Sequence, residues 1–292
     1  MASTLRSIPG YLLCVPGLLL AVDPLRVLEP WARVNYTSTC VAALAARGYV
    51  VSPAERASIQ RFEDALLAAG VLSPTSREGC LDRFIYLCVG GTAAAHVVNF
   101  IDPNASGQFF GTAAHTATGI KWNGSSYLDT GILASSLDPY NLRLSVYTRE
   151  QGSAAGADMG TIAGGGSALY LISRSSSAGR PYAALAGMEL QPTMEAAPGY
   201  FTASASGSAP PPDVVSTRMY RNGTAFFAGA GTPLALAART IYLGAANIGG
   251  AAGAFVDREA CYWSGGKSYT PAQEVAVAAA VQQFQADQGR AV

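Results

Sequence analysis

The stretch RTIYLGAANIGG (239–250), followed after a short aromatic segment by TPAQEVAVAAAVQQFQADQGR (270–290), decides the fold that we expect. Apolar residues alternate in the first part, which is typical of a strand with one buried face. In the second part Thr270 can cap a helix, Pro271 takes the first helical position, and Gln273 completes a capping box. A strand-rich chain closed by one short helix is typical of a β-sandwich, so we expect the preceding residues to supply the other strands.

The helix predicted over 271–289 has one apolar stripe. Val277, Val281 and Phe284 recur at i, i+4 and i+7 and therefore lie on one side of it. A helix of this length is marginal in water on its own, so we expect the stripe to pack against the sandwich. Gly289 ends the helix. The polar side chains expected to face water are Gln282, Gln283, Gln285 and Asp287.

From Cys80 onward, short apolar runs are separated by Gly, Asn, Asp, Ser and Pro. Asn222-Gly223 predicts a two-residue hairpin turn because both residues tolerate positive φ, and Asn123-Gly124 repeats the device. The tract 203–213 is expected to be an exposed loop. The pattern predicts a mainly β fold, an antiparallel jelly-roll sandwich over 80–292 that includes the C-terminal helix 271–289. The expected strands are 83–89, 97–101, 126–132, 142–149, 168–174, 181–187, 215–222, 225–229 and 239–247.

Two further segments precede the sandwich. Residues 35–79 predict a small helical hairpin module, in which Ser52, Pro53 and Glu55 mark a capped helix start. Residues 1–34 carry the run YLLCVPGLLLAV between prolines, which is shorter than the ~20 apolar residues of a membrane span. We therefore expect no membrane span but an extended apolar arm that a partner covers. Its candidate attachment residues are Tyr11, Leu12, Leu13, Val15, Leu18, Leu19 and Leu20.

Composition excludes several classes of function. Lys and Arg number 19, Asp and Glu number 19, and the basic residues form no run, so nucleic acid is not an expected partner. The five cysteines are widely scattered and only two histidines are present. We therefore expect no metal site, no cofactor and no disulfide framework, with the cysteines as mostly buried thiols.

Several stretches together carry a resemblance to a known family. They are GYVVSPAERASIQRFEDALLAAGVL (48–72), GGTAAAHVVNFIDP (90–103), TATGIKWNGSSYLDTGI (116–132), LRLSVYTRE (142–150), YRNGT (220–224) and the C-terminal part from IYLGAANIGG to QADQGR. Over residues 35–292 the chain resembles tailed-bacteriophage virion proteins that join a short helical module to a concanavalin A-like (lectin/glucanase, LamG-like) jelly-roll domain. The resemblance implies a capsid-decorating, head-fibre or tail-associated structural protein, and it supplies no ligand.

The residues of the chain do not assemble a catalytic site that we recognise. Glucanases of this fold resemble one another in an E-x-D-x-x-E strand, and retaining hydrolysis needs two carboxylates about 5 Å apart. Here Glu189 and Glu195 are the nearest approach, and Pro192 separates them. His96 and His115 lie near many serines but without a G-x-S-x-G elbow. We expect His96 to be structural at a strand start, His115 to lie in a loop, and the protein not to be an enzyme.

Candidate ligand contacts are few. Asp138-Pro139-Tyr140-Asn141, with Asp129, vaguely resembles the calcium loop of lectins of this fold, but the supply of carboxylates is thin and a turn is the favoured interpretation. The aromatic residues that could stack on a sugar, and that would serve equally well in a core, are Trp122, Tyr127 and Trp263.

Two functional hypotheses remain open. The first is a non-enzymatic virion structural protein that attaches to other virion proteins through its N-terminal region and displays the sandwich, as a homo-oligomer. The alternative is a carbohydrate-binding, lectin-like module that binds a host-surface glycan. The sequence favours the first because the apolar arm needs a partner, whereas no cluster of polar and aromatic residues marks a sugar site.

Overall fold

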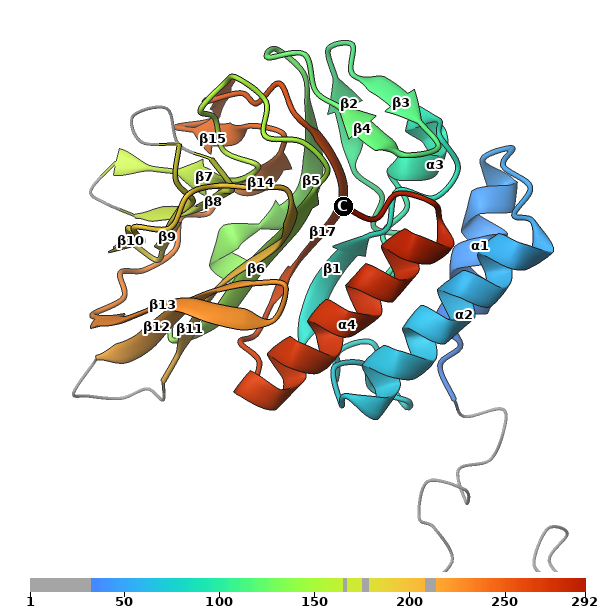
Figure 1. The fold of residues 1–292 in the computed structure, drawn as a ribbon, viewed down its shortest axis with the longest axis horizontal. Coiled ribbons are helices and arrows are strands. Elements are labelled where there is room, and N and C mark those ends of the chain that lie inside the picture. The colour runs from blue at the N-terminus through green and yellow to red at the C-terminus, as the bar shows by residue number, and fades with distance from the viewer. Residues whose placement is uncertain (1–32, 165–166, 175–178, 208–213) are drawn as a thin grey trace, which may run out of the picture. The chain divides into compact units, whose positions relative to one another are not determined.

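One layer of helices and two layers of β-sheet build the chain in the computed structural model (Figure 1). The structure describes residues 33–164, 167–174, 179–207 and 214–292. Residues 34–292 form one unit. The attachment residues predicted in the apolar arm lie outside the described residues, so that prediction is not tested.

The helices begin where local capping chemistry predicts. Ser52 accepts a hydrogen bond from the Glu55 N–H, and the Glu55 side chain accepts one from the Ser52 N–H. Thr270 and Gln273 form the same reciprocal pair. None of the helices in the described part of the chain is long and apolar enough to cross a membrane. The helices are α1 (Tyr36–Ala46), α2 (Pro53–Ala68), α3 (Ala93–His96) and α4 (Pro271–Asp287).

The apolar stripe of α4 packs as expected. Val277, Val281 and Phe284 are buried, and the ring centroid of Phe284 lies 5.4 Å from that of Phe62 on α2. The expectation that Gln285 faces water is wrong: it is fully buried, and its Oε1 accepts a hydrogen bond from Cys261 Sγ at 3.1 Å. The buried side of α4 is wider than its stripe because this helix touches both α2 and the sheet beneath.

Sheet A lies under the helices (Figure 1). Its strand order is β13-β12-β11-β6-β17-β4-β3, and β1 also pairs with β17. All of its pairings are antiparallel. Its strands are β1 (Asp82–Tyr86), β3 (Ala114–Thr116), β4 (Gly119–Lys121), β6 (Asn141–Thr148), β11 (Gly199–Ser206), β12 (Val215–Arg221), β13 (Thr224–Gly231) and β17 (Glu259–Gly266).

Sheet B is the other layer of the sandwich, in the order β10-β9-β8-β7-β14-β5-β2. It is antiparallel except for a short parallel pairing of β15 with β7. Its strands are β2 (Gln108–Phe110), β5 (Tyr127–Leu133), β7 (Met159–Ile162), β8 (Ala168–Ile172), β9 (Tyr182–Leu185), β10 (Met188–Leu190), β14 (Thr240–Leu243), β15 (Ala246–Ile248) and β16 (Ala251–Gly253).

The antiparallel sandwich is therefore confirmed, with three local corrections. The tract 203–213 is not all loop, because residues 203–206 belong to β11 at the centre of sheet A. Residues 97–101 form no strand and make only an isolated bridge, from Asn99 to Tyr86. The Asn222-Gly223 hairpin joins β12 to β13 as predicted, whereas the Asn123-Gly124 turn joins β4 of sheet A to β5 of sheet B.

A buried ion pair lies within sheet A, next to the segment that leads into α4. Arg143 on β6 contacts Asp82 on β1, and both side chains are fully buried. Arg143 also donates to Ser264 Oγ and to the Tyr269 hydroxyl, each at 2.8 Å. Asp82 keeps the pKa of Arg143 well above its usual value, although burial opposes this. The guanidinium therefore stays charged beneath the N-terminal part of α4.

Candidate functional site

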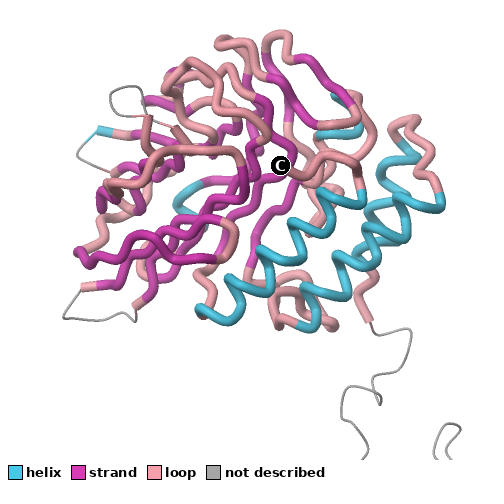
Figure 2. Tube along the Cα trace, viewed as in Figure 1, coloured by secondary structure: helices cyan, strands magenta, loops and turns pink. Residues whose placement is uncertain are grey.

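The two sheets differ in what covers their outer faces. On sheet A, the outward ring of Tyr262 lies 6.1 Å from the ring of Phe62, so the helices close this face. Figure 2 shows α1, α2 and α4 gathered on that side of the strands. On sheet B, the outward residues Tyr127, Tyr170 and Tyr182 are half-buried. The accessible face of the sandwich is therefore the outer face of sheet B.

Strand register places one row of side chains on this face. Residues directly opposite each other in neighbouring antiparallel strands point to the same side of a sheet. The row combines polar, aromatic and small residues, and it runs across strands β2, β5, β14, β7, β8, β9 and β10. Its members, in that order, are Gln108, Asp129, Tyr242, Gly160, Tyr170, Ala184 and Glu189.

Four rings gather at the β2 end of this face, and we call Phe110, Tyr127, Tyr242 and Phe255 the aromatic cluster. Tyr127 lies at its centre. Its ring stacks 4.9 Å from that of Phe110 and 4.5 Å from that of Tyr242, and it meets Phe255 at 6.3 Å in a tilted arrangement. Phe110 is 38% exposed, whereas Tyr242 is buried. The outer surface of the cluster is therefore formed by Phe110, with Tyr127 and Phe255 half-exposed beside it.

Polar groups lie directly beside these rings. Gln108 is exposed on the strand that carries Phe110. Asp129 follows Tyr127 on β5, where it accepts hydrogen bonds from the Gly131 N–H at 2.9 Å and from Thr240 Oγ1 at 3.2 Å. Rings next to carboxylate and amide groups can contact the apolar face of a sugar while its hydroxyls are hydrogen-bonded.

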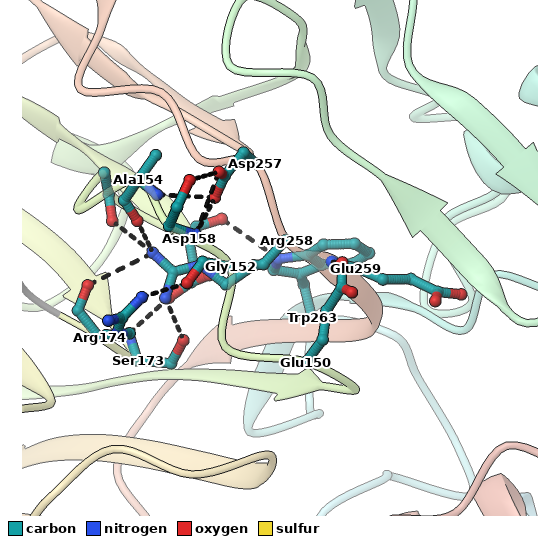
Figure 3. Close-up of polar contacts among 12 residues, drawn as sticks. Glu150, Gly152, Ala154, Asp158, Ser173, Arg174, Asp257, Arg258, Glu259 and Trp263 are labelled. Carbon is teal, nitrogen blue, oxygen red and sulfur yellow. Dashed lines mark hydrogen bonds and ion pairs between the residues drawn. The ribbon is translucent and has the colours of Figure 1, made fainter. Parts of the chain in front are cut away.

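A buried arginine fixes the segment that carries Phe255. Arg258 Nε lies 3.2 Å from Asp158 Oδ1, and neither side chain is accessible to solvent. Its Nη1 donates to Ser173 Oγ at 3.1 Å, and its Nη2 donates to the Ala154 carbonyl at 3.0 Å (Figure 3). These contacts hold residues 150–158 and 173–174 to the start of β17. The carboxylate, hydroxyl and carbonyl oxygens around Arg258 therefore already contact its guanidinium group.

Asp257 fixes the same segment from the other side. Its carboxylate accepts hydrogen bonds from the Ser153 N–H at 2.9 Å and from the Ala154 N–H at 2.8 Å, and also from the Ser153 hydroxyl (Figure 3). Partial burial would raise the pKa of Asp257, but these hydrogen bonds hold the pKa below its usual value. The carboxylate is therefore ionised at neutral pH, because hydrogen bonds from these donors favour its charged form.

The backbone approach beside Phe255 requires glycine. A Cβ atom on Gly156 would lie 2.0 Å from the Phe255 carbonyl oxygen, and the Ala157 N–H donates to the Ala254 carbonyl at 2.7 Å. Residues 154–158 and 254–258 are consequently locked side by side. Through Gly156, Asp257 and Arg258, the sequence places the Phe255 ring against Tyr127.

A second aromatic pair lies further along the same face. The rings of Tyr170 and Tyr182 stack 5.6 Å apart, and Glu189 is exposed on β10 nearby. Burial raises the pKa of Tyr170, and burial and hydrogen bonding raise that of Tyr182, so both hydroxyls remain protonated donors at neutral pH.

The aromatic residues predicted from the sequence separate into two groups. Tyr127 lies in the aromatic cluster. Trp122 and Trp263 are 1% and 0% exposed, and their rings meet 5.9 Å apart in the core. Their burial corrects the expectation that either could contact a glycan. Trp263 Nε1 instead donates to the Asp158 carbonyl at 3.2 Å, which is a structural contact.

The two histidines contact each other. Their Nδ1 atoms are 3.1 Å apart, and His96 Nε2 accepts from the Gly91 N–H. His96 ends α3 instead of starting a strand, and His115 lies on β3 instead of in a loop. Burial, with His115 and Arg290 nearby, lowers the pKa of His96 to about 3. His96 is therefore neutral, with a structural role.

The acidic residues considered in the sequence have separate positions. Glu189 lies on β10, and Glu195 is exposed in the following segment. Asp138 accepts from the Tyr140 N–H at 2.9 Å, which is a turn contact as predicted. The described residues contain no group of three or more His, Cys, Asp or Glu side chains placed to hold a metal ion.

Sequence reasoning missed Phe110, Tyr242 and Phe255. Phe110 is in a three-residue strand, which is too short for its periodicity to show. Tyr242 was predicted to be in a strand, but the orientation of that strand depends on its pairing with β5. The one available signal was the density of aromatic residues near Gly-rich turns.

No protein-family model matches the chain, and no curated protein sequence matches it. Solved structures do match. Domain 4 of AbnA, a GH43 extracellular arabinanase from Geobacillus stearothermophilus, in complex with arabinotriose, is 12% identical, with a TM-score of 0.51 over 68% of this chain and 98% of that domain. This likeness, at low identity, supports the β-sandwich fold alone.

Two further solved structures match less closely. The CBM40 of the Ruminococcus gnavus IT-sialidase is 11% identical, with a TM-score of 0.38 over 55% of this chain and 95% of that one. The Trypanosoma rangeli sialidase is 11% identical, with a TM-score of 0.41, and the match spans 76% of this chain and 38% of the sialidase.

Proposed function

We propose that the protein is a non-enzymatic carbohydrate-binding module and that the aromatic cluster on sheet B contacts the glycan. The observation that carries the proposal is the open outer face of sheet B, where Phe110 is 38% exposed beside Tyr127, Gln108 and Asp129. A domain of this sandwich fold has been solved in complex with arabinotriose, so the fold is one that can carry a sugar-binding surface. This reverses the order of the two hypotheses drawn from the sequence.

Ring geometry decides which surface a sugar would meet. Both faces of the Tyr127 ring are covered, by Phe110 on one side and Tyr242 on the other. Phe110 is the exposed end of this stack, so its outer face offers the stacking surface. Gln108 and Asp129 then supply the polar contacts on the neighbouring strand positions.

The test is binding to a panel of plant, bacterial and host-cell polysaccharides, measured by affinity electrophoresis and calorimetry. Phe110→Ala should weaken binding about tenfold, because removing one central aromatic contact costs ~1.4 kcal/mol or more. The matched control is Val275→Ala, since Val275 is 58% exposed on α4, in the layer that covers sheet A. Equal losses in both variants, or no binding to any polysaccharide, would refute the proposal.

The virion remains the proposed setting for this module. Attachment was predicted from residues 1–34, of which 1–32 lie outside the described residues, so the particle, the partner proteins and the homo-oligomer stay predictions.

A further inference from the structure

A cavity of about 210 Å³ lies where the segment after α2 meets β1 and the segment after α3. It shares no residue with the aromatic cluster. At ~30 Å³ per water molecule, its volume corresponds to about seven waters, which is the size of one small ring with its substituents. The lining residues are Arg77, Glu78, Asp82, Arg83, Asn99, Ile101, Asp102, Ala105 and Ile132.

Asn99, one of the lining residues, carries an amide whose donor is unpaired within the described part of the chain. The residue is 1% exposed, and its Oδ1 accepts hydrogen bonds from the Ile85 and Ile101 N–H groups, each at 3.1 Å. These two contacts orient the amide, so its Nδ2 is the remaining polar group. Nδ2 is buried and has no hydrogen-bond partner among the described residues. A buried donor left unpaired destabilises the fold, and a ligand acceptor would remove that penalty.

Arg77 supplies a second donor of the same kind. Its Nη2 donates to Thr39 Oγ1 at 3.0 Å, whereas its Nε is buried and lacks a partner within the described ranges. Arg83 adds a cationic group from β1, and Glu78 and Asp102 add two carboxylates. The cavity therefore offers both donors and acceptors.

The charges decide between an anion and a neutral ligand. Asp82 is neutralised by its buried partner Arg143, which leaves two cations and two carboxylates around the cavity. An anion would gain from Arg77 and Arg83 and lose to Glu78 and Asp102, so the Coulomb terms largely cancel. A hydroxyl group both donates and accepts, and it can satisfy all of these groups without carrying charge.

The apolar part of the lining fits the same class of ligand. Ile101, Ala105 and Ile132 supply hydrocarbon surface, while the polar groups come from the other lining residues. A sugar ring likewise combines C–H groups with a rim of hydroxyls. We propose that this cavity binds one neutral monosaccharide residue, with Asn99 and Arg77 donating to its oxygens and Asp102 or Glu78 accepting from its hydroxyls. This goes beyond the proposed function, since it requires no contact with the aromatic cluster.

The test follows the Asn99 side-chain amide by NMR in uniformly ¹⁵N-labelled protein, with its resonance assigned by its loss in Asn99→Asp. The probes are D-glucose, D-galactose, D-mannose and L-arabinose at millimolar concentration, with acetate as the anion. At least one sugar should shift the Asn99 amide saturably, while acetate should not. Asn99→Asp retains the Oδ1 acceptor and removes the donor. It should therefore raise the dissociation constant for that sugar about tenfold.

Asp102→Asn is the second variant, in case Asn99→Asp unfolds. Asp102 Oδ1 accepts from the Asn104 N–H, a contact that an asparagine keeps, so this variant removes only the charge and one acceptor. Asp102→Asn should also weaken binding of the monosaccharide, whereas Phe110→Ala should leave that binding unchanged. Shifts with acetate alone, or no shift with any sugar, would overturn the proposal. If Phe110→Ala abolished monosaccharide binding while Asp102→Asn retained it, the cavity proposal would be overturned too. The proposed function of the aromatic cluster would still stand.

Discussion

Replacing Phe284 by alanine tests how the helical layer is held to the sandwich. Phe284 is 1% exposed, and its ring centroid lies 5.4 Å from that of Phe62 on α2. Phe62 in turn lies 6.1 Å from Tyr262 on β17, so a chain of three rings joins α4, α2 and sheet A. Removing the Phe284 ring from this packed interface leaves a cavity, and Phe→Ala changes of this kind cost ~3–5 kcal/mol.

Thermal and urea unfolding measure this cost. For a unit of this size, 1 kcal/mol shifts the midpoint by about 2–4 °C, so Phe284→Ala should lower it by roughly 6–20 °C. Gln283→Ala is the matched control, because Gln283 is exposed on the same turn and its Nε2 donates to Asp287 Oδ1 at 2.8 Å. It should change the free energy of unfolding by less than ~0.5 kcal/mol.

A double-mutant cycle with Phe62→Leu sharpens the result. Aromatic pairs in contact are coupled by ~0.5–1.5 kcal/mol beyond the area that they bury. Equal midpoints for Phe284→Ala and Gln283→Ala would refute the packing described above. Strict additivity with Phe62→Leu would refute the direct coupling of α4 to α2.

Three other predictions follow from the buried polar groups and the N-terminal arm. Arg143→Met leaves Asp82 buried without its partner and should cost ~3–5 kcal/mol in urea unfolding; a cost below ~1 kcal/mol would contradict the buried ion pair. The pKa of His96 is lowered from 6.5 to about 3, so the unfolded chain binds the extra proton in that interval. The contribution of His96 to the free energy of unfolding should therefore be fully present above pH 6.5 and decrease as the pH falls toward 3. In urea unfolding measured across this pH range, His96→Asn should flatten the dependence. Deleting residues 1–32 should leave a folded sandwich that no longer joins a virion, as measured by particle incorporation; normal occupancy would show that the arm is not the attachment segment.

Local chemistry made the helix starts and one hairpin predictable. Ser52 and Thr270 each have a capping partner three residues ahead, and Asn222 adopts a φ of 50° beside Gly223 at 80°. These features depend on four to six consecutive residues, so no tertiary contact is needed to recognise them. The confirmed sandwich class follows from the same kind of evidence, because alternating apolar runs between turn residues require no knowledge of pairing.

Strand β11 and the aromatic cluster were not predicted from the sequence, because tertiary contacts determine both. Strand β11 (GYFTASAS) is rich in small residues and is buried because β6 and β12 flank it and α4 lies over it. The aromatic cluster draws on residues 110, 127, 242 and 255, which lie in four separate segments. The register of β2, β5 and β14 brings the first three together, and the contacts of Asp257 and Arg258 bring residue 255 beside them. No spacing in the sequence encodes either arrangement.

The position of β17 has a consequence for how the protein is made. This strand pairs with β6, β4 and β1, so it joins segments of sheet A that do not otherwise pair with each other. During synthesis, β6 and β1 therefore wait with unpaired backbone groups until residue 266 has left the ribosome. A stop codon between residues 206 and 259 would leave the β17-facing edges of β1 and β6 exposed, and we expect such products to be insoluble and degraded.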